Sequence, residues 1–169
     1  MVAVMSHSKW ALLTALTMVL MLAACAQTEG LQARGGAPTK NWHGRLGLRV
    51  ESNPVQSLSA TLDLSGDAQA GDLLLSGPLG TALLALSWRP GRATMQRNGQ
   101  SREYDSVSAL MQDALGADLP LTALFAWLDG KEAAVEGWHV DLSQLSTGRL
   151  SARRTGPAPA VDLRLMLEP

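Results

Sequence analysis

The sequence predicts a mainly β domain, in which one antiparallel sheet curls into a half-closed barrel with two short helices as a lid. Three observations predict this fold. From residue 42 onward, most segments alternate apolar and polar residues with a period of two, as strands with one buried face do. Short turn sequences join these segments, so that successive strands run antiparallel. One stretch in the middle of the chain follows a helical period instead.

Apolar residues at every second position place the strands. The first strand is indicated by Leu46, Leu48 and Val50. The later sets are Leu58, Ala60, Leu62 and Leu64; Leu73 to Leu75; Ala82, Leu84, Leu86 and Trp88; and Val161, Leu163, Leu165 and Leu167. Towards the C-terminus, strands are expected at about 136–145, 148–154 and 160–167.

Turn residues separate the predicted strands. They are Ser65-Gly66-Asp67, Gly77-Pro78-Leu79-Gly80, Pro90-Gly91 and Asn98-Gly99. Pro90-Gly91 suits the centre of a type II turn. Asn98-Gly99 predicts a two-residue hairpin, because both residues tolerate the positive φ that such a hairpin requires.

Two helices are predicted between the strands. The first carries an apolar stripe at i, i+3, i+4, i+7 and i+8, formed by Val107, Leu110, Met111, Ala114 and Leu115. Asp105 or Ser106 is its expected N-cap, and Gly116 ends it. The second helix begins near Asp118 and ends before Gly130, with Leu121, Leu124, Phe125 and Leu128 on one side.

A long antiparallel sheet twists and curls, so its apolar concave face needs a cover. The two helices are the obvious cover, but they are too short to seal the whole sheet. Two interpretations follow from the residues alone. Leu, Trp and Met side chains fill the space as an ordinary core, or they surround an apolar cavity beneath a lid.

The N-terminus has the features of a lipoprotein signal. Lys9 precedes an apolar run from Trp10 to Leu22, which is shorter than the roughly 20 residues that span a bilayer. Leu22-Ala23-Ala24-Cys25 resembles the bacterial lipobox, at which the cysteine is lipidated after cleavage. We therefore expect a signal peptide at 1–24, a lipidated Cys25 with a flexible tether at 25–41, and a folded domain at 42–169. An ordinary signal followed by a free thiol is the alternative.

The residue after the cysteine bears on location. By resemblance to the bacterial sorting rule, Asp at this position retains a lipoprotein in the inner membrane. Ala26 and Gln27 stand here instead. We therefore expect a lipid anchor in the outer membrane, with the domain facing the periplasm.

Composition excludes several classes of function. Of the 169 residues 46% are hydrophobic and 17% charged, which favours a folded core over disorder. A net charge of −1 disfavours nucleic acid as a partner. A single cysteine and three histidines disfavour disulfides and metal sites, and we expect no cofactor. His43 and His139 are interpreted as surface or satisfied histidines. No catalytic motif is present, so an enzyme is not expected.

Several segments together resemble the LolB family of outer-membrane lipoproteins. They are the lipobox, Gly44-Arg45-Leu46-Gly47, the run Leu73-Leu74-Leu75-Ser76-Gly77-Pro78-Leu79-Gly80 leading to Trp88, Gly116-Ala117-Asp118-Leu119-Pro120, Trp127-Leu128 and Gly137-Trp138. The resemblance covers about residues 42–167. It implies an open β-barrel with a helical lid over an apolar cavity. It also implies a receptor that accepts lipoproteins from a periplasmic, LolA-like carrier and inserts them into the outer membrane.

Candidate site residues follow from the apolar face and from the resemblance. The expected acyl-chain cavity is formed by Leu62, Leu84, Leu86 and Trp88 of the sheet with Leu110, Phe125 and Leu128 of the lid. In LolB-like proteins the leucine of the Pro-Leu-Gly loop protrudes and is needed for delivery, which implies a membrane-insertion loop of Pro78, Leu79 and Gly80. Packing of Leu79 back onto the sheet is the alternative interpretation.

The expected partners are the carrier, acylated lipoproteins and outer-membrane lipid, and the chain is expected to be a monomer. A second class of function also remains open. In that alternative, the chain is an accessory or structural outer-membrane lipoprotein whose β-domain binds a protein partner.

Overall fold

The computed structural model describes residues 40–169. The predicted signal peptide, Cys25 and nearly all of the predicted tether lie outside the described residues. Nine strands are present in the described part: β1 (Asn41–Val50), β2 (Gln56–Gly66), β3 (Gly71–Ser76), β4 (Ala82–Arg89), β5 (Arg92–Arg97), β6 (Gln100–Tyr104), β7 (Trp138–Asp141), β8 (Arg149–Arg154) and β9 (Val161–Leu167). The helices are α2 (Val107–Leu115), α3 (Leu121–Leu128) and the short 3₁₀ helix η2 (Leu145–Thr147).

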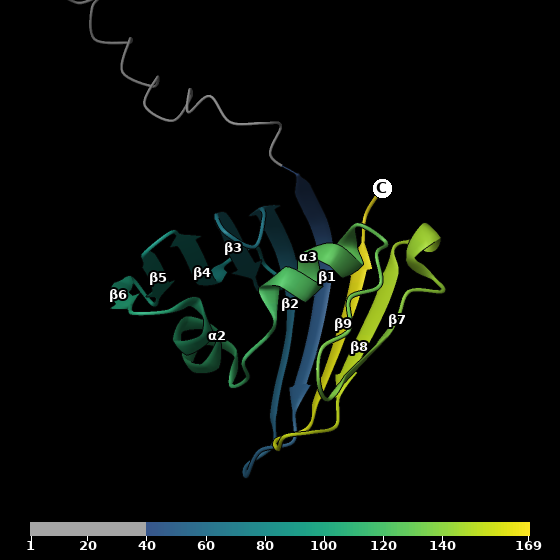
Figure 1. The fold of residues 1–169 in the computed structure, drawn as a ribbon. Helices are drawn as coiled ribbons and strands as arrows, with labels where there is room; N and C mark the ends of the chain where they lie inside the picture. Colours follow the sequence, from purple (N-terminus) through teal and green to yellow (C-terminus); the bar gives the residue numbers. More distant parts are fainter. Residues whose placement is uncertain (1–39) are drawn as a thin grey trace, which may run out of the picture. The chain divides into compact units, whose positions relative to one another are not determined.

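These strands form one antiparallel sheet in the order β6-β5-β4-β3-β2-β1-β9-β8-β7. The first and last strands of the chain are neighbours, with Leu46 opposite Leu165 and Leu48 opposite Leu163. The outermost strands, β6 and β7, do not pair with each other, so the sheet stays open. Figure 1 shows α2 and α3 lying across one face of this sheet. The predicted half-closed barrel with a helical lid is confirmed.

The conformations of two turns also agree with the turn types that the sequence predicts. Asn98 and Gly99 both have positive φ, 53° and 75°, as a type I′ hairpin turn requires. Gly91 has a φ of 74° and follows Pro90 between β4 and β5, as expected for a type II turn.

Helix α2 begins and ends where the sequence predicts. Ser106 is its N-cap, and the Ser106 hydroxyl accepts a hydrogen bond from the Ala109 N–H at 3.1 Å. Gly116 closes the helix in the left-handed conformation. Helix α3 begins later than expected, after Pro120. Asp118 lies before it and accepts a hydrogen bond from the Ser108 hydroxyl at 2.6 Å, so it joins the connecting segment to α2.

The strand predicted at 136–145 is shorter in the structure. Strand β7 ends at Asp141, whose carboxylate accepts a hydrogen bond from the Ser143 N–H at 2.9 Å. This local bond turns the backbone away from the sheet, and η2 follows at Leu145–Thr147. The polar side chain of Asp141 therefore ends the strand.

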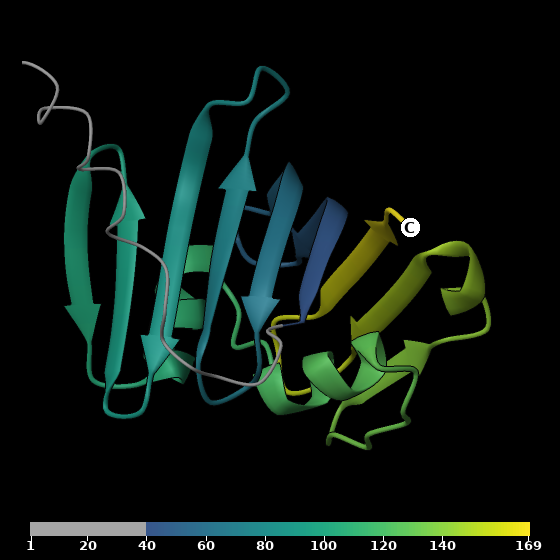
Figure 2. The same cartoon turned by 90° about the horizontal axis from the view of Figure 1, so that it is seen from above.

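The core lies between the sheet and the helices. Inward-facing leucines of the central strands, Trp88, and the buried faces of α2 and α3 belong to one apolar cluster. Seen from above, the β3–β4 loop extends beyond the neighbouring strand ends (Figure 2). No helix in the described range is long and apolar enough to cross a membrane.

Candidate functional site

The loop between β3 and β4 exposes a leucine almost completely. Leu79 has 95% of its surface accessible, far more than any other large apolar side chain among the described residues. The Gly80 N–H donates to the Gly77 carbonyl at 2.9 Å, and the Gly77 N–H donates to the Thr81 carbonyl at 2.9 Å. Leu79 therefore does not pack back onto its sheet.

The residues of this loop explain the exposure. Pro78 and Gly80 occupy the second and fourth positions of the turn that the 77–80 hydrogen bond closes, where proline and glycine are favoured. Gly80 has a φ of 74°, and nothing lies within 4 Å of a Cβ built there. The turn is held by its own backbone hydrogen bonds, and Leu79 projects outward from it.

A wholly apolar cavity lies between the sheet and the helical segment. It is lined by Leu46, Leu62, Leu64, Leu73, Trp88, Met111, Leu115, Leu119, Leu121, Leu124, Leu163 and Leu165. Its volume is about 20 Å³. One water molecule needs about 10–15 Å³ of such space, so the cavity has room for about one water. It is therefore too small for an acyl chain. The structure therefore shows a closed state in which leucines fill most of the space.

The seven side chains expected to line a cavity are all buried, but they do not share one space. Leu62 and Trp88 line the apolar cavity. Leu84 lines a separate groove beside α2, described next. Leu86, Leu110, Phe125 and Leu128 belong to the surrounding core, and Leu86 also borders the groove on the outer face that is described below. Contact of any of these residues with an acyl chain stays a prediction.

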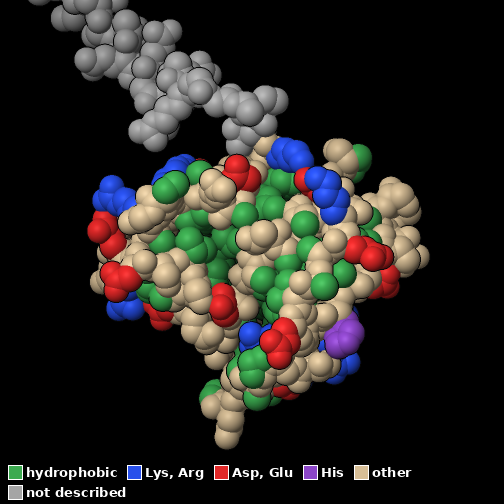
Figure 3. Space-filling model, in the orientation of Figure 1, with side chains coloured by type: hydrophobic (Ala, Val, Ile, Leu, Met, Phe, Trp, Pro, Cys, Tyr) green, Lys and Arg blue, Asp and Glu red, His purple; other side chains and the backbone are tan. Residues whose placement is uncertain are grey.

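An open groove of about 350 Å³ lies beside α2, next to the Leu79 loop. We call it the α2 groove. Its apolar lining comes from Leu48, Val50, Leu58, Leu75, Leu83, Leu84, Ala114 and Leu115, with Gln56, Ser57 and Arg97 as polar residues. Its size falls in the range of roughly 300–1,000 Å³ that is typical of ligand pockets. More generally, Figure 3 shows many apolar side chains near the centre of the molecule in the view of Figure 1.

The side chain of Leu115 lies between these two spaces. It lines both the α2 groove and the apolar cavity. Leu83, also in the α2 groove, lies 3.6 Å from a Cβ built on Gly77, at the base of the Leu79 loop. The Leu79 loop, the α2 groove and the apolar cavity are therefore neighbours in space.

Polar contacts attach α2 to the β5–β6 hairpin. The Arg97 guanidinium donates to the Ala114 carbonyl at 2.6 Å, near the C-terminal end of the helix. Asp113 accepts a hydrogen bond from the Tyr104 hydroxyl and pairs with Arg102 at 3.1 Å. The hydrogen bond from Tyr104, followed by the charge of Arg102, holds the pKa of Asp113 below its usual value. These contacts hold α2 on the sheet.

Helix α3 is held mainly by aromatic packing. Phe125 lies with its ring centroid 5.4 Å from Trp42 and 6.3 Å from Trp88, and Trp127 lies 5.9 Å from Trp138. The Trp127 indole donates to the Ala133 carbonyl at 3.0 Å.

One ion pair ties the C-terminal end of α3 to the residue that precedes β1. The Lys40 ammonium contacts both oxygens of Asp129, at 2.6 and 2.7 Å. The hydrogen bond from Lys40 lowers the pKa of Asp129. A side-chain link between α3 and the sheet therefore depends on the charged form of Asp129.

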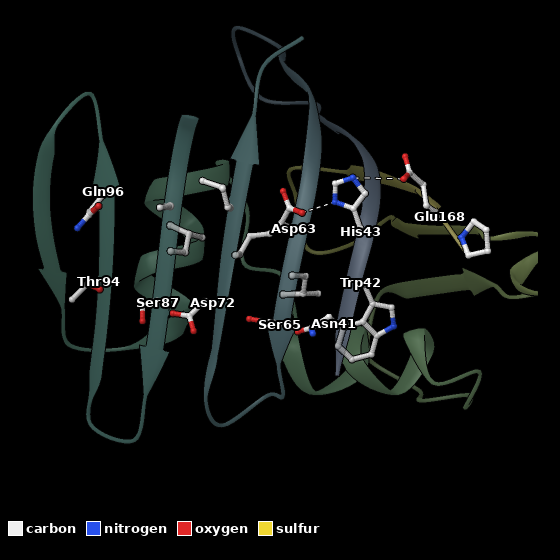
Figure 4. Close-up of a pocket in the computed structure, with 16 residues that line it drawn as sticks. Asn41, Trp42, His43, Asp63, Ser65, Asp72, Ser87, Thr94, Gln96 and Glu168 are labelled. Carbon is white, nitrogen blue, oxygen red and sulfur yellow. Dashed lines mark hydrogen bonds and ion pairs between the residues drawn. The ribbon is translucent and has the colours of Figure 1, made fainter. Parts of the chain in front are cut away.

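A further groove, of about 690 Å³, lies on the opposite, outer face of the sheet. Figure 4 shows its lining residues, which extend from Gln96 and Thr94 on β5 to Trp42 and His43 on β1. His43 is hydrogen-bonded to Asp63 through Nδ1, and its Nε2 lies 3.7 Å from a Glu168 carboxylate oxygen. The bond to Asp63 raises the pKa of His43.

Several lining residues of the apolar cavity were not among the sequence candidates. Leu46 and Leu163 come from strands at opposite ends of the chain, and no local pattern shows that β1 pairs with β9. Met111 and Leu115 belong to the helical stripe that the sequence does show. That stripe indicates burial, but it does not distinguish cavity lining from solid core.

Comparison with known proteins gives a consistent result. A family model described as "Outer membrane lipoprotein LolB" matches residues 40–155. A relative in Bordetella petrii is 26% identical over 176 residues, covering 86% of this chain and 85% of the relative. One in Halorhodospira halophila is 35% identical over 117 residues, covering 68% of this chain and 54% of the relative. One in Chromohalobacter salexigens is 35% identical over 99 residues, covering 58% of this chain and 44% of the relative.

All three relatives are named outer-membrane lipoprotein LolB. The chain spans about half the length of the Halorhodospira and Chromohalobacter relatives in these matches. The family match includes β1 to β8, both helices and the Leu79 loop. This chain belongs to the LolB family.

Proposed function

We propose that this chain is a non-enzymatic outer-membrane lipoprotein that accepts other lipoproteins and inserts them into the outer membrane. In this proposal, a LolA-like periplasmic carrier supplies the client, and the acyl chains of the client enter between the sheet and the helices. The chain works as a monomer anchored through Cys25. The names of the family and of its relatives support this function.

One structural observation carries the proposal. Leu79 is fully exposed next to an apolar groove, and that groove shares Leu115 with an enclosed apolar cavity. An ordinary core has no need of an open apolar entrance, and an ordinary loop tip is polar. The combination of an exposed leucine with an open apolar groove suits a protein that moves an apolar ligand between its own interior and a lipid surface.

The energetics explain why a protein must mediate this transfer. Each of the roughly fifteen methylenes in an acyl chain contributes about 0.8 kcal/mol on burial, or on the order of 12 kcal/mol per chain. Escape of three such chains into water is therefore negligibly slow. Transfer from carrier to receptor to bilayer proceeds without ATP if each acceptor binds the acyl chains more tightly than the last.

Because the apolar cavity is closed in the structure, loading must displace part of its wall. Polar contacts from Arg97, Arg102 and Tyr104 hold α2 in place, whereas α3 is held by apolar packing and the Lys40–Asp129 pair. We expect acyl chains to enter at the α2 groove while α3 moves away from the sheet. Apolar contacts with the acyl chains then replace the aromatic contacts that α3 gives up.

Leu79 serves delivery in this scheme. Burying one leucine contributes only about 1.5–3 kcal/mol, too little to hold the chain at a bilayer. A lipid on Cys25 makes the contact intramolecular, so that a weak contact suffices to orient the groove towards the membrane. The tether of about 15 residues has a root-mean-square reach on the order of 20 Å, which permits this rotation.

Two transfer steps measured side by side test the proposal. We expect Leu79→Glu to fold, to take labelled lipoprotein from the carrier at the normal rate, and to reduce incorporation into liposomes at least tenfold. The carboxylate resists desolvation, and the apolar contact is lost. Leu79→Phe should retain delivery, because exposed apolar surface is what the step requires.

Leu74→Glu is the matched control, since Leu74 is exposed on the outer face of the sheet and is not part of the loop. It should leave both steps unchanged. Normal incorporation by Leu79→Glu would remove Leu79 from the delivery step. Failure of the unmodified chain to accept lipoprotein from the carrier would contradict the proposed function itself and favour an accessory lipoprotein.

A further inference from the structure

Five outward-facing arginines of the sheet lie together on one side of its outer face. Outward-facing positions of the neighbouring strands β8, β9 and β1 hold five arginines, namely Arg149, Arg153, Arg164, Arg45 and Arg49. The same three strands contain a single acidic residue, Asp162. These strands are adjacent in the sheet although they come from opposite ends of the chain.

Three of these arginines have no acidic partner in the described part of the chain. Arg49 pairs with Glu51 at 2.6 Å, and Arg153 lies 3.6 Å from Asp162. For Arg45, Arg149 and Arg164, no carboxylate among residues 40–169 lies within 4.0 Å. Their guanidinium groups are exposed and able to accept an anionic ligand.

An exposed apolar side chain lies among these cations. Met166 is opposite Arg149 on β8 and opposite Arg45 on β1. It is 52% accessible, second only to Leu79 among the exposed large apolar residues. We call Arg45, Arg149, Arg164 and Met166 the arginine face.

The strand register places this face level with the Leu79 loop. A single row of paired positions runs Arg149, Met166, Arg45, Thr61 and Ser76 across five strands. Ser76 is the last residue of β3, and the loop begins directly after it. Since neighbouring strands are about 4.8 Å apart, the Cα atoms of Arg45 and Ser76 are separated by roughly 10 Å. The arginine face thus begins two strands away from the base of the loop.

We propose that the arginine face binds the phosphate groups of an anionic phospholipid surface and thereby orients the Leu79 loop towards the bilayer. The inference rests on the proposed function in one respect, the approach of the Leu79 loop to a membrane. Arginine guanidinium groups bind phosphate oxygens through paired hydrogen bonds. A basic surface near an anionic membrane gains about fivefold in binding per arginine.

Two observations favour a lipid surface over an acidic protein. The face is continuous, through one row of the sheet, with a loop whose leucine is 95% exposed. The face itself also combines cations with an exposed methionine, which suits the boundary between phosphates and acyl chains. An acidic protein surface would be complementary to the charge alone.

Vesicle binding of an unlipidated chain tests the inference. We would use residues 25–169 with Cys25→Ala and measure co-sedimentation with phosphatidylcholine vesicles, with and without phosphatidylglycerol. Binding should be stronger to the anionic vesicles and should weaken as salt is raised. Arg45→Gln/Arg149→Gln should reduce binding to anionic vesicles at least tenfold, and it should leave uptake of lipoprotein from the carrier unchanged.

Arg89→Gln/Arg92→Gln is the matched control. Both arginines face outward on β4 and β5, both are already paired with an acid, and the change in net charge is the same. This control should retain vesicle binding. Equal loss in both double variants would overturn the proposal by assigning the effect to net charge. Normal vesicle binding with impaired uptake from the carrier would also overturn it, and would assign the face to an acidic protein.

The outcome is separable from that of the proposed function. If the unmodified chain accepts lipoprotein but shows no preference for anionic vesicles, the arginine face is excluded as a lipid-binding surface while the receptor function stands. If the chain binds anionic vesicles through these arginines but never accepts lipoprotein, the arginine face stands as a lipid-binding surface and the receptor function is contradicted.

Discussion

Two leucines of the β3–β4 hairpin differ in surroundings although they are equally exposed. Leu83 is 39% accessible and lines the α2 groove, whereas Leu74 is 36% accessible and lines the groove on the outer face. A β-bulge explains the position of Leu83. Leu75 pairs with Leu84 and Ser76 pairs with Ala82, so Leu83 is the extra residue on β4. Bulges of this kind redirect side chains, and here the bulge adds a leucine to the entrance.

This pair gives a residue-level test of the entrance. We expect Leu83→Glu to weaken binding of an acylated peptide by about tenfold or more, since burial of a leucine contributes roughly 1.5–3 kcal/mol. Leu74→Glu should bind the peptide normally, because its side chain faces away from the helices. Displacement of a hydrophobic fluorophore by the peptide provides the measurement, with the melting temperature recorded alongside. Equal binding by the two variants would contradict entry through the α2 groove.

At the scale of elements, the two helices are held by different forces. Residues on α2 receive hydrogen bonds from Arg97 and Tyr104 of the β5–β6 hairpin, so this helix and hairpin are linked by polar contacts as well as packing. Helix α3 buries six of its eight residues and makes aromatic contacts with β1, β4 and β7. Apolar contacts are non-directional, and acyl chains can replace them. This difference favours α3 as the moving part of the lid.

The Lys40–Asp129 pair gives an element-level test. We expect Asp129→Asn to increase hydrogen exchange within residues 121–128 by up to about fivefold, in keeping with a partly exposed ion pair worth at most about 1 kcal/mol. Exchange within α2 should not change. Glu103→Gln, which removes a surface ion pair with Arg92 on the β5–β6 hairpin, serves as the control. Unchanged exchange in α3 of Asp129→Asn would show that the pair does not hold the helix.

The same pair predicts a dependence on pH. The pKa of Asp129 is lowered in the folded chain, first of all by its hydrogen bond from Lys40. A lowered pKa means that the stabilisation is complete above the ordinary value of 3.8 and is lost as the pH falls through the folded value. After correction for the pH dependence of the intrinsic exchange rate, the protection of α3 amides should therefore fall in acid more in the unmodified chain than in Asp129→Asn.

At the scale of the whole molecule, anchoring and transfer are separate properties. Cys25 lies outside the described residues, and the arrangement of the α2 groove, apolar cavity and Leu79 loop depends only on residues after it. We expect Cys25→Ala to remove the protein from the outer membrane while uptake of lipoprotein from the carrier stays within about twofold of normal, because the anchor adds effective concentration and not contacts. Membrane fractionation and the uptake assay measure the two properties. Firm outer-membrane association of processed Cys25→Ala would refute the anchor.

Local patterns in the sequence determine most of the elements. The alternation of Leu46, Leu48 and Val50 identifies β1, since neighbouring side chains of a strand point to opposite faces. Ser106 and Gly116 bound α2, because backbone groups at helix ends need local partners and a left-handed closing residue. Asn98-Gly99 specifies its hairpin because both residues adopt the positive φ that the turn requires. Each of these features depends on residues a few positions apart.

Only the tertiary structure decides how distant segments meet. The pairing of β1 with β9 brings Leu46 and Leu163 into one cavity. Together with the pairing of β8 with β9, it places Arg45 and Arg149 on the two sides of Met166. Neither meeting leaves a trace in local periodicity. The closed state of the cavity depends on packing between distant segments. The direction of the Leu83 side chain depends on the β-bulge. Secondary structure follows from sterics and hydrogen bonds along a few residues, whereas cavities and charged faces arise from contacts between residues far apart in the chain.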